Sequence, residues 1–274
     1  MGVRRLFIHF LSAFIPVKKW RKSFRDKYMV SNILSYMGDR KSTVIIPLGE
    51  NCACAMILGD AGLRRYSLPF DWSGLEDKDN DDTGGLYTKC NLIIQDCSGM
   101  LNLEDFEDLT KSGYAAKHEH RFIVNRKTGL RYIHDFSVSS SVKDQWPVFY
   151  EKYTRRIKRM YSEIERAERV LFIYDKVMKK ECYQARHNVE FYSFSEIVTE
   201  LKKKWPCKTF CFLLFLHDES INVKEYKETH PYENVTYVWL NNMWQEEESY
   251  DKSDFLGNRD VVLQYLKEHL TFCK

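Results

Sequence analysis

Thr43-Val-Ile-Ile-Pro-Leu-Gly-Glu-Asn-Cys-Ala-Cys-Ala-Met-Ile-Leu-Gly59 is the segment from which the architecture of this chain can be predicted. Its first half is a short apolar run with β-branched residues, which predicts a buried strand over 43–48. Gly49 permits a tight turn, Asn51 is a good helix N-cap, and the residues that follow favour a helix. A strand that turns directly into a helix is therefore expected, with Cys52 on the first helical turn.

Cys52 is the candidate nucleophile. Unpaired backbone N–H groups and the positive end of the helix dipole meet at the first turn of a helix, and both stabilise a thiolate. We therefore expect a lowered pKa for the Cys52 thiol, with backbone donors nearby for an oxyanion. The alternative is that Cys52 is a small buried apolar residue, like its neighbour Cys54.

The composition is that of an ordinary soluble globular protein, with 44% hydrophobic and 30% charged residues in 274. Residues 1–28 contain eight Lys/Arg and one Asp, so the rest of the chain is net acidic although the whole carries +3. This distribution argues against a general nucleic-acid binder. The eight cysteines include no Cys-x-x-Cys pair, so we expect reduced thiols, no metal site and no cofactor in a cytoplasmic protein.

The N-terminal segment 1–42 is expected to be a basic amphipathic element. An apolar run at 6–17 follows Arg4 and Arg5, and Lys18-Lys-Trp-Arg-Lys22 stands where a signal peptide would have its cleavage site. The run is too short to span a bilayer. Aromatic residues at helical spacing among Lys and Arg favour an anionic membrane surface, so we expect peripheral attachment through residues 1–28. Docking as a terminal helix is the alternative.

Polar residues after the cysteine helix suggest more of the site. A short strand is predicted over 66–70, with Asp71 and Trp72 just beyond its end, where α/β sheets place ligand-contacting residues. A turn or N-cap role for Asp71 is equally open. The acidic loop at 74–85 contains Asp77, Asp79 and Asp81 in Asp-x-Asp spacing, which is known from glycosyltransferase metal sites but is more typical of a solvated loop.

The rest of the chain alternates between helices and strands. After a helix at 86–94 and an irregular acidic stretch at 103–118, residues 121–136 predict a β-hairpin that delivers His134 and Asp135 at the end of its second arm. His134 is the candidate base, and a structural histidine is the alternative. An amphipathic helix at 141–167 precedes strands at 169–175, 209–216 and 235–240 and helices at 195–204 and 259–269.

This alternation predicts a single α/β domain over 43–274. We expect a mostly parallel sheet with helices on both faces, a Rossmann-like three-layer arrangement with the hairpin inserted and the strand at 43–48 in a central position.

Four short blocks, in order, carry a resemblance to a known family: Pro47-Leu-Gly-Glu-Asn-Cys-Ala-Cys-Ala55, Gly62-Leu-Arg through Pro69-Phe-Asp-Trp72, Ile133-His-Asp-Phe136, and Tyr153-Thr-Arg-Arg-Ile through Arg169-Val-Leu-Phe-Ile173. Together they resemble a bacterial family of papain-like cysteine peptidases, a domain of unknown function. The resemblance covers roughly residues 43–175. It implies Cys52 as nucleophile and His134 as its base.

A papain-like fold is α+β, with the histidine on later antiparallel strands, and we keep it as the alternative fold. The third catalytic member is open among Asp71, Asp135 and Asp175, with Asp71 first. Gly49, Asn51, Trp72 and Asp135 are the candidate substrate-binding residues. The N-terminal segment separately resembles the opening of bacterial enzymes of surface-polysaccharide synthesis. A cysteine-dependent hydrolase or acyltransferase is therefore the leading functional hypothesis. A glycosyltransferase or other polysaccharide-assembly enzyme is the second, and a membrane-bound scaffold the third.

Overall fold

The computed structural model describes residues 42–49, 51–75, 84–110, 119–179, 194–244 and 257–270. The N-terminal segment and the acidic Asp-x-Asp run, both singled out in the sequence, lie outside these ranges. Within the described part, no helix is long and apolar enough to cross a membrane.

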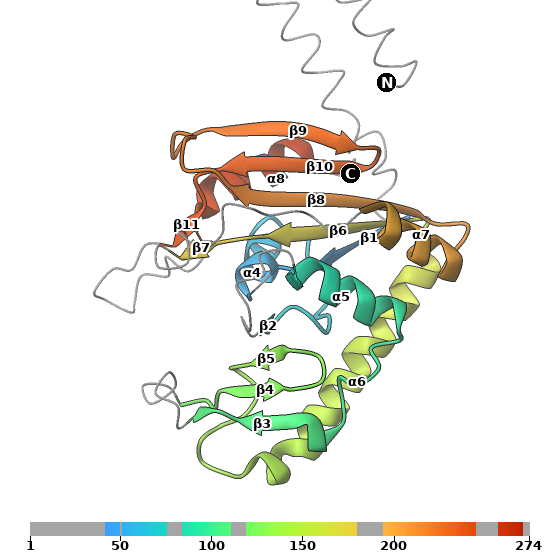
Figure 1. Cartoon of the computed structure of the whole chain (residues 1–274), viewed down its shortest axis with the longest axis vertical. Coiled ribbons are helices and arrows are strands. Elements are labelled where there is room, and N and C mark those ends of the chain that lie inside the picture. Colours follow the sequence, from blue (N-terminus) through green and yellow to red (C-terminus); the bar gives the residue numbers. More distant parts are fainter. Residues whose placement is uncertain are drawn as a thin grey trace, which may run out of the picture.

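Sheet A confirms the prediction of a mostly parallel sheet. Its five strands lie in the order β1-β6-β8-β10-β9, in which the first four are parallel and β9 is antiparallel to β10 (Figure 1). The strands are β1 (Thr43–Pro47), β6 (Arg169–Asp175), β8 (Thr209–His217), β9 (Tyr226–Tyr232) and β10 (Val235–Leu240).

The predicted central position of β1 is wrong, because β1 forms one edge of sheet A. The chain adds β6, β8 and β10 successively on the same side of β1, so the first strand keeps a single strand neighbour. The other edge is β9, which the sequence did not reveal. Its residues are mostly polar and it contains Pro231, both typical of an edge strand and both weak signals for a strand.

Helices cover both faces of sheet A. Successive side chains of β6 point to opposite faces and are buried on both, so each face needs a covering layer. Val170, Phe172 and Tyr174 belong to one core cluster, and Leu171 and Ile173 belong to the other. The first cluster takes in residues of α5 (Gly84–Ile94), α6 (Val142–Arg166) and α7 (Phe194–Lys204); the second takes in residues of α4 (Ala53–Asp60) and α8 (Arg259–His269).

Sheet B is antiparallel and lies beside the first core cluster, below sheet A in Figure 1. Its order is β2-β5-β4-β3, from β2 (Ser73–Leu75), β3 (Phe106–Asp108), β4 (Ile123–Asn125) and β5 (Leu130–Tyr132). The predicted hairpin is confirmed as β4 and β5. Within the stretch predicted to be irregular, a short 3-10 helix, η1 (Leu103–Asp105), and β3 form instead.

The predicted strand at 66–70 is wrong. Residues 69–72 form turns, and the strand starts only at Ser73. Pro69 lacks the backbone N–H that a strand ladder needs, which explains why this apolar run does not pair. A minor pairing joins β7 (Met178–Lys179) to β11 (Met243–Trp244).

Helix α6 runs along both sheets and joins them (Figure 1). Phe149 and Tyr153 pack against the Tyr132 ring of sheet B, with ring centroids 5.1 and 5.3 Å apart. Met160 and Ile164, farther along the helix, share the core cluster with residues of β1 and β6. Ser141 caps the helix, because its hydroxyl accepts a hydrogen bond of 3.1 Å from the Asp144 N–H.

We predict that Ser141→Ala lowers the free energy of unfolding by about 1 kcal/mol, because one N–H at the start of α6 loses its acceptor. Chemical denaturation measures the change. Ser139→Ala is the control: this exposed serine caps no helix, and the effect should stay within about 0.5 kcal/mol. Equal losses in the two variants would contradict the capping role.

Candidate active site

Cys52 lies at the turn between β1 and α4, as predicted, but one position earlier in the helix. Cys52 itself occupies the N-cap position, and its carbonyl accepts a 3.0 Å hydrogen bond from the Met56 N–H. The Asn51 side chain accepts from the Ala53 N–H at 2.8 Å, so Asn51 supports the turn from the residue before the cap. The cysteine side chain makes no capping bond, which leaves the sulfur available for chemistry.

The expectation of a lowered thiol pKa is not met. Burial raises the pKa of Cys52 above its ordinary value, and this effect outweighs the backbone N–H of Cys52 and the Arg131 guanidinium, which both favour the thiolate. A thiol in this position holds its proton at neutral pH in the free protein. The helix N-terminus is present, but the effect of burial on the thiol is larger.

Lys89 of α5 fixes the cysteine turn to sheet B. Its side chain is fully buried, and its ammonium donates hydrogen bonds to the carbonyl oxygens of Gly49 and, at 3.0 Å, of Ser73. Gly49 precedes the cysteine turn, whereas Ser73 begins β2. The buried lysine therefore holds the end of β1 against the start of β2.

Gly49 also meets the cysteine helix directly. A Cβ at position 49 would approach the Cys54 Cβ closer than real carbon atoms come, so only glycine fits without a shift. The Cys54 thiol is buried and lies 3.4 Å from the Ile173 carbonyl oxygen, to which it donates. Burial raises the pKa of Cys54 strongly, which makes it the structural member of the Cys52/Cys54 pair.

Asp71 is buried beside the site and paired with Arg64. The Arg64 Nη2 and Nε donate to the Asp71 Oδ2 at 2.6 and 2.9 Å, and the Leu68 N–H donates to the same oxygen at 3.1 Å. Burial nevertheless raises the Asp71 pKa, against the pull of Arg64. Within the described part of the chain, the Asp71 Oδ1 has no hydrogen-bond partner.

His134 lies on the loop after β5 and is exposed. Its ring makes edge contacts with Trp72 at 5.9 Å and His120 at 6.0 Å between centroids. Arg64 lies 5.7 Å from the centre of the Trp72 ring. The contacts thus link Asp71, Arg64, Trp72 and His134 in one continuous chain of neighbours.

Asp135, next to His134, anchors the hairpin on α6. Its carboxylate accepts hydrogen bonds from Lys152 at 2.5 Å and from the Tyr153 hydroxyl at 2.9 Å. The side chain is almost completely buried, with 3% of its surface exposed. These contacts hold the loop that carries His134.

Asp175, the third candidate carboxylate, lies at the end of β6. It accepts a 2.9 Å hydrogen bond from the Asn242 side chain, whose backbone N–H donates to the His217 Nδ1 at 2.9 Å. Burial lowers the pKa of His217, which favours the neutral ring that accepts this bond. This cluster occupies the ends of β6 and β8 and the segment after β10.

The structure therefore brings the predicted residues into two connected groups. Gly49, Asn51 and Cys52 form the turn, and Lys89 ties it to Ser73 at the start of β2. The second group is Asp71 and Trp72, which directly precede β2, together with His134, whose ring contacts Trp72. The Asp71 carboxylate forms an ion pair with Arg64. The Asp135 carboxylate forms an ion pair with Lys152 and accepts a hydrogen bond from the Tyr153 hydroxyl. The assignment of Cys52, His134 and Asp71 as catalytic residues stays a prediction.

The sequence reasoning missed Lys89 and Arg131. Helical spacing places Lys89 on the same apolar stripe as Leu86, Cys90 and Ile93. A lysine on the buried face of a helix was the sequence signal that could have identified it. Arg131 alternates with the buried Leu130 and Tyr132, which places it on the opposite face of the hairpin.

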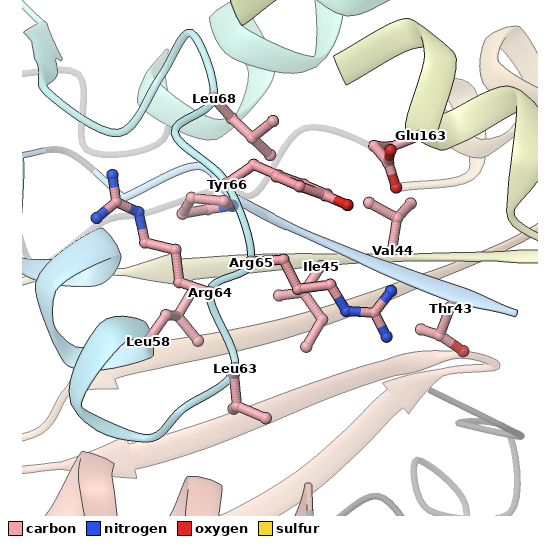
Figure 2. Close-up of a pocket in the computed structure, with 11 residues that line it drawn as sticks. Thr43, Val44, Ile45, Leu58, Leu63, Arg64, Arg65, Tyr66, Leu68 and Glu163 are labelled. Carbon is pink, nitrogen blue, oxygen red and sulfur yellow. The ribbon is translucent and has the colours of Figure 1, made fainter. Parts of the chain in front are cut away.

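The described residues include no group of three His, Cys, Asp or Glu side chains that could hold a metal ion. A cavity lies along the outer edge of β1, where Figure 2 shows Tyr66 reaching across toward Glu163. Its volume of about 30 Å³ admits little more than one water molecule. Cys52, Asp71, Trp72 and His134 do not line it, so it is not the predicted site.

We predict opposite effects for two glycine substitutions around α4. Gly49→Ala should lower the free energy of unfolding by about 1–3 kcal/mol, because the new methyl group overlaps Cys54. Gly59→Ala, inside α4 with open space around it, should raise that free energy by about 0.5–1 kcal/mol. Thermal and urea unfolding measure both. A Gly49→Ala protein as stable as the parent would refute the close approach.

Comparison with known proteins adds the family. The model of a family described as "Putative papain-like cysteine peptidase" matches residues 43–220, which include Cys52, Asp71 and His134. An uncharacterized protein of Acanthamoeba polyphaga mimivirus is 26% identical over 144 residues, covering 48% of this chain and 61% of the relative. The chain thus spans less than two thirds of that relative.

No solved structure matches the chain. The viral relative gives no support to a bacterial origin, and neither comparison supports the glycosyltransferase alternative or the polysaccharide-synthesis likeness of the N-terminus. The description of the matching family is that of a cysteine peptidase, a class of hydrolase. On this evidence, the chain belongs to the family described as papain-like cysteine peptidases.

Proposed function

We propose that this protein is a cysteine-dependent hydrolase or acyltransferase in which Cys52 is the nucleophile and His134 the base. The observation that carries the proposal is the position of Cys52 at the N-terminus of α4, inside the segment that the family model matches. A turn of this kind presents a side chain together with backbone N–H groups. Cys54 and Cys90, which lie in different core clusters, are both buried and unsuited to attack a substrate.

The raised pKa of Cys52 favours one kind of mechanism, general-base catalysis, over a preformed ion pair. A preformed thiolate–imidazolium pair would need a lowered thiol pKa, whereas burial raises it here. The thiol therefore loses its proton to His134 as the sulfur attacks the acyl carbon, in general-base catalysis. Backbone N–H groups at the start of α4 stabilise the oxyanion, and His134 returns the proton to the leaving group. Water then hydrolyses the thioester, or another nucleophile accepts the acyl group.

The remaining predicted residues position these groups. Asp71 acts through Arg64, whose guanidinium contacts the Trp72 ring against which His134 packs. Gly49 and Asn51 shape the turn that carries Cys52, and Asp135 holds the His134 loop on α6. Trp72 offers an apolar wall for a substrate chain next to the imidazole.

An activated ester such as p-nitrophenyl acetate tests the proposal. We expect a burst of p-nitrophenol and an acetyl group on Cys52 by peptide mass spectrometry. Cys52→Ser should abolish the burst, and His134→Ala should slow acylation about 10²–10⁴-fold, the usual contribution of a general base. In the His134→Ala variant, the part of the acylation rate that depends on the Cys52 thiol is the part that Cys52→Ser removes. Because the thiol pKa is raised, this rate should keep rising above pH 8.5, the ordinary thiol pKa.

Cys207→Ser is the matched control, since this cysteine is exposed and lies far along the chain at the start of the β8 segment. Its burst should equal that of the parent protein. A burst that survives Cys52→Ser, or an acetyl group found on Cys207 alone, would reject Cys52 as nucleophile.

We also propose that residues 1–28 attach the enzyme to an anionic, cytoplasmic membrane surface. The sequence supports this with eight Lys/Arg against one Asp beside an apolar, aromatic stripe. In the full-length chain, changing Lys18, Lys19, Arg21 and Lys22 to Gln should weaken sedimentation with vesicles containing phosphatidylglycerol, each charge being worth about 1 kcal/mol. Vesicles of phosphatidylcholine alone are the control. Undiminished binding to phosphatidylglycerol vesicles would disprove electrostatic attachment.

A further inference from the structure

Arg131 is a cation of the candidate site for which the described part of the chain provides no carboxylate. Three other cations near the site are engaged: Arg64 pairs with Asp71, Lys152 pairs with Asp135, and Lys89 donates to two backbone carbonyls. Within the described ranges, Arg156 also has a buried Nη1 without a hydrogen-bond partner, but its charge acts on Asp71 and it packs over the Tyr153 ring. Among the described residues, the Arg131 side chain has no hydrogen bond or ion pair, and its Nε is buried without a partner. A buried guanidinium N–H without an acceptor is energetically costly, so it calls for a ligand.

The Arg131 side chain is held in place on β5, in the interior of sheet B. Its strand neighbours are Gly74 on β2 and Val124 on β4. The guanidinium occupies the space that a side chain at position 74 would take, since a Cβ there would lie 2.8 Å from Nη2 and 2.9 Å from Nε. On its other side it packs over the Phe122 ring, 5.6 Å from the ring centre. The guanidinium group, with its fork of N–H donors, is therefore held in one orientation and is not a freely moving surface charge.

Arg131 is connected to the cysteine turn through β2: it packs against Gly74, and the neighbouring Ser73 carbonyl shares the Lys89 ammonium with the Gly49 carbonyl. In keeping with this arrangement, the Arg131 charge favours the Cys52 thiolate. It does not neutralise itself against the sulfur, since burial keeps the thiol protonated at neutral pH. The positive charge thus stays available beside the nucleophile. A substrate group that lies next to the reacting acyl carbon would meet it.

We propose that Arg131 binds a carboxylate of the substrate, so that the Cys52 site acts on acyl compounds that carry a carboxylate near the reacting carbonyl. This inference rests on the proposed nucleophile and adds its substrate class. A single planar guanidinium matches a carboxylate through two parallel hydrogen bonds and balances its one charge. Phosphate sites, with more charge and more acceptor oxygens, are usually formed by several donors.

Two alkylating reagents test the inference without knowledge of the natural substrate. Iodoacetate carries a carboxylate, whereas iodoacetamide is neutral, and both react with the thiolate of Cys52 with loss of iodide. The ratio of their rates at one pH is independent of the thiolate fraction, so it isolates recognition of the carboxylate. In the wild type, we expect this ratio to be at least tenfold higher at Cys52 than at the exposed Cys207, with both sites followed by peptide mapping.

Arg131→Gln should reduce the Cys52 ratio to that of Cys207, and Arg131→Lys should retain part of it, since lysine keeps the charge but not the fork. Arg126→Gln is the matched control: Arg126 follows β4 in the same hairpin but is exposed and paired with Glu107. Circular dichroism checks that each variant is folded, and Arg131→Lys carries the comparison if Arg131→Gln is not. A ratio unchanged by both Arg131 substitutions overturns the inference.

Failure of the proposed function gives a different result. If p-nitrophenyl acetate does not acylate Cys52 but the iodoacetate preference depends on Arg131, the carboxylate site stands and the hydrolase does not. If Cys52 reacts with neither reagent, thermal unfolding in acetate and in phosphate decides. Stabilisation by acetate that is lost in Arg131→Gln supports the inference, whereas stabilisation by phosphate alone, or by neither anion, rejects it.

Discussion

The hydrogen bonds of Lys89 are the interaction on which the candidate site depends. A fully buried ammonium donates to the carbonyl oxygens of Gly49 and Ser73, and these residues lie at the end of β1 and the start of β2. A lysine is compact and carries three donors, so one side chain can satisfy several acceptors from separate segments. Without it, two buried carbonyls would lose their donor, and the cysteine turn of sheet A would lose its tie to sheet B.

The fold combines two sheets with different roles. Sheet A supplies a strand–turn–helix unit that displays Cys52, and sheet B supplies the arm that carries Arg131 and leads to His134. Helix α6 packs on both, so the long helix holds the two sheets in a fixed arrangement. A mostly parallel sheet that carries the cysteine and an antiparallel sheet that carries the histidine combine features of the two architectures expected from the sequence.

Sequence periodicity was sufficient for the elements with strong local patterns. The helix at 141–167 and the strands at 169–175 and 235–240 were predicted nearly to the residue, because their apolar repeats are long or continuous. It failed at Tyr66–Phe70, where an apolar run lacks a partner, and at β9, where an edge strand is polar. The edge position of β1 depends on the order in which strands assemble, which periodicity does not contain. The prediction of a lowered thiol pKa failed because it took account of the helix N-terminus and not of the burial of Cys52, which outweighs it.

The edge position of β1 has a consequence for the durability of the site. β1 is paired to β6 alone, whereas β6 and β8 each have strands on both sides. Separation of one ladder is therefore enough to detach the strand that leads into the cysteine turn, and the pairings among β6, β8 and β10 can persist while this happens. The free energy of local opening at the site is consequently smaller than the free energy of global unfolding. Amide hydrogens of β1 that bond to β6 would exchange before those shared by β6 and β8, and heat would separate loss of catalysis from loss of the core.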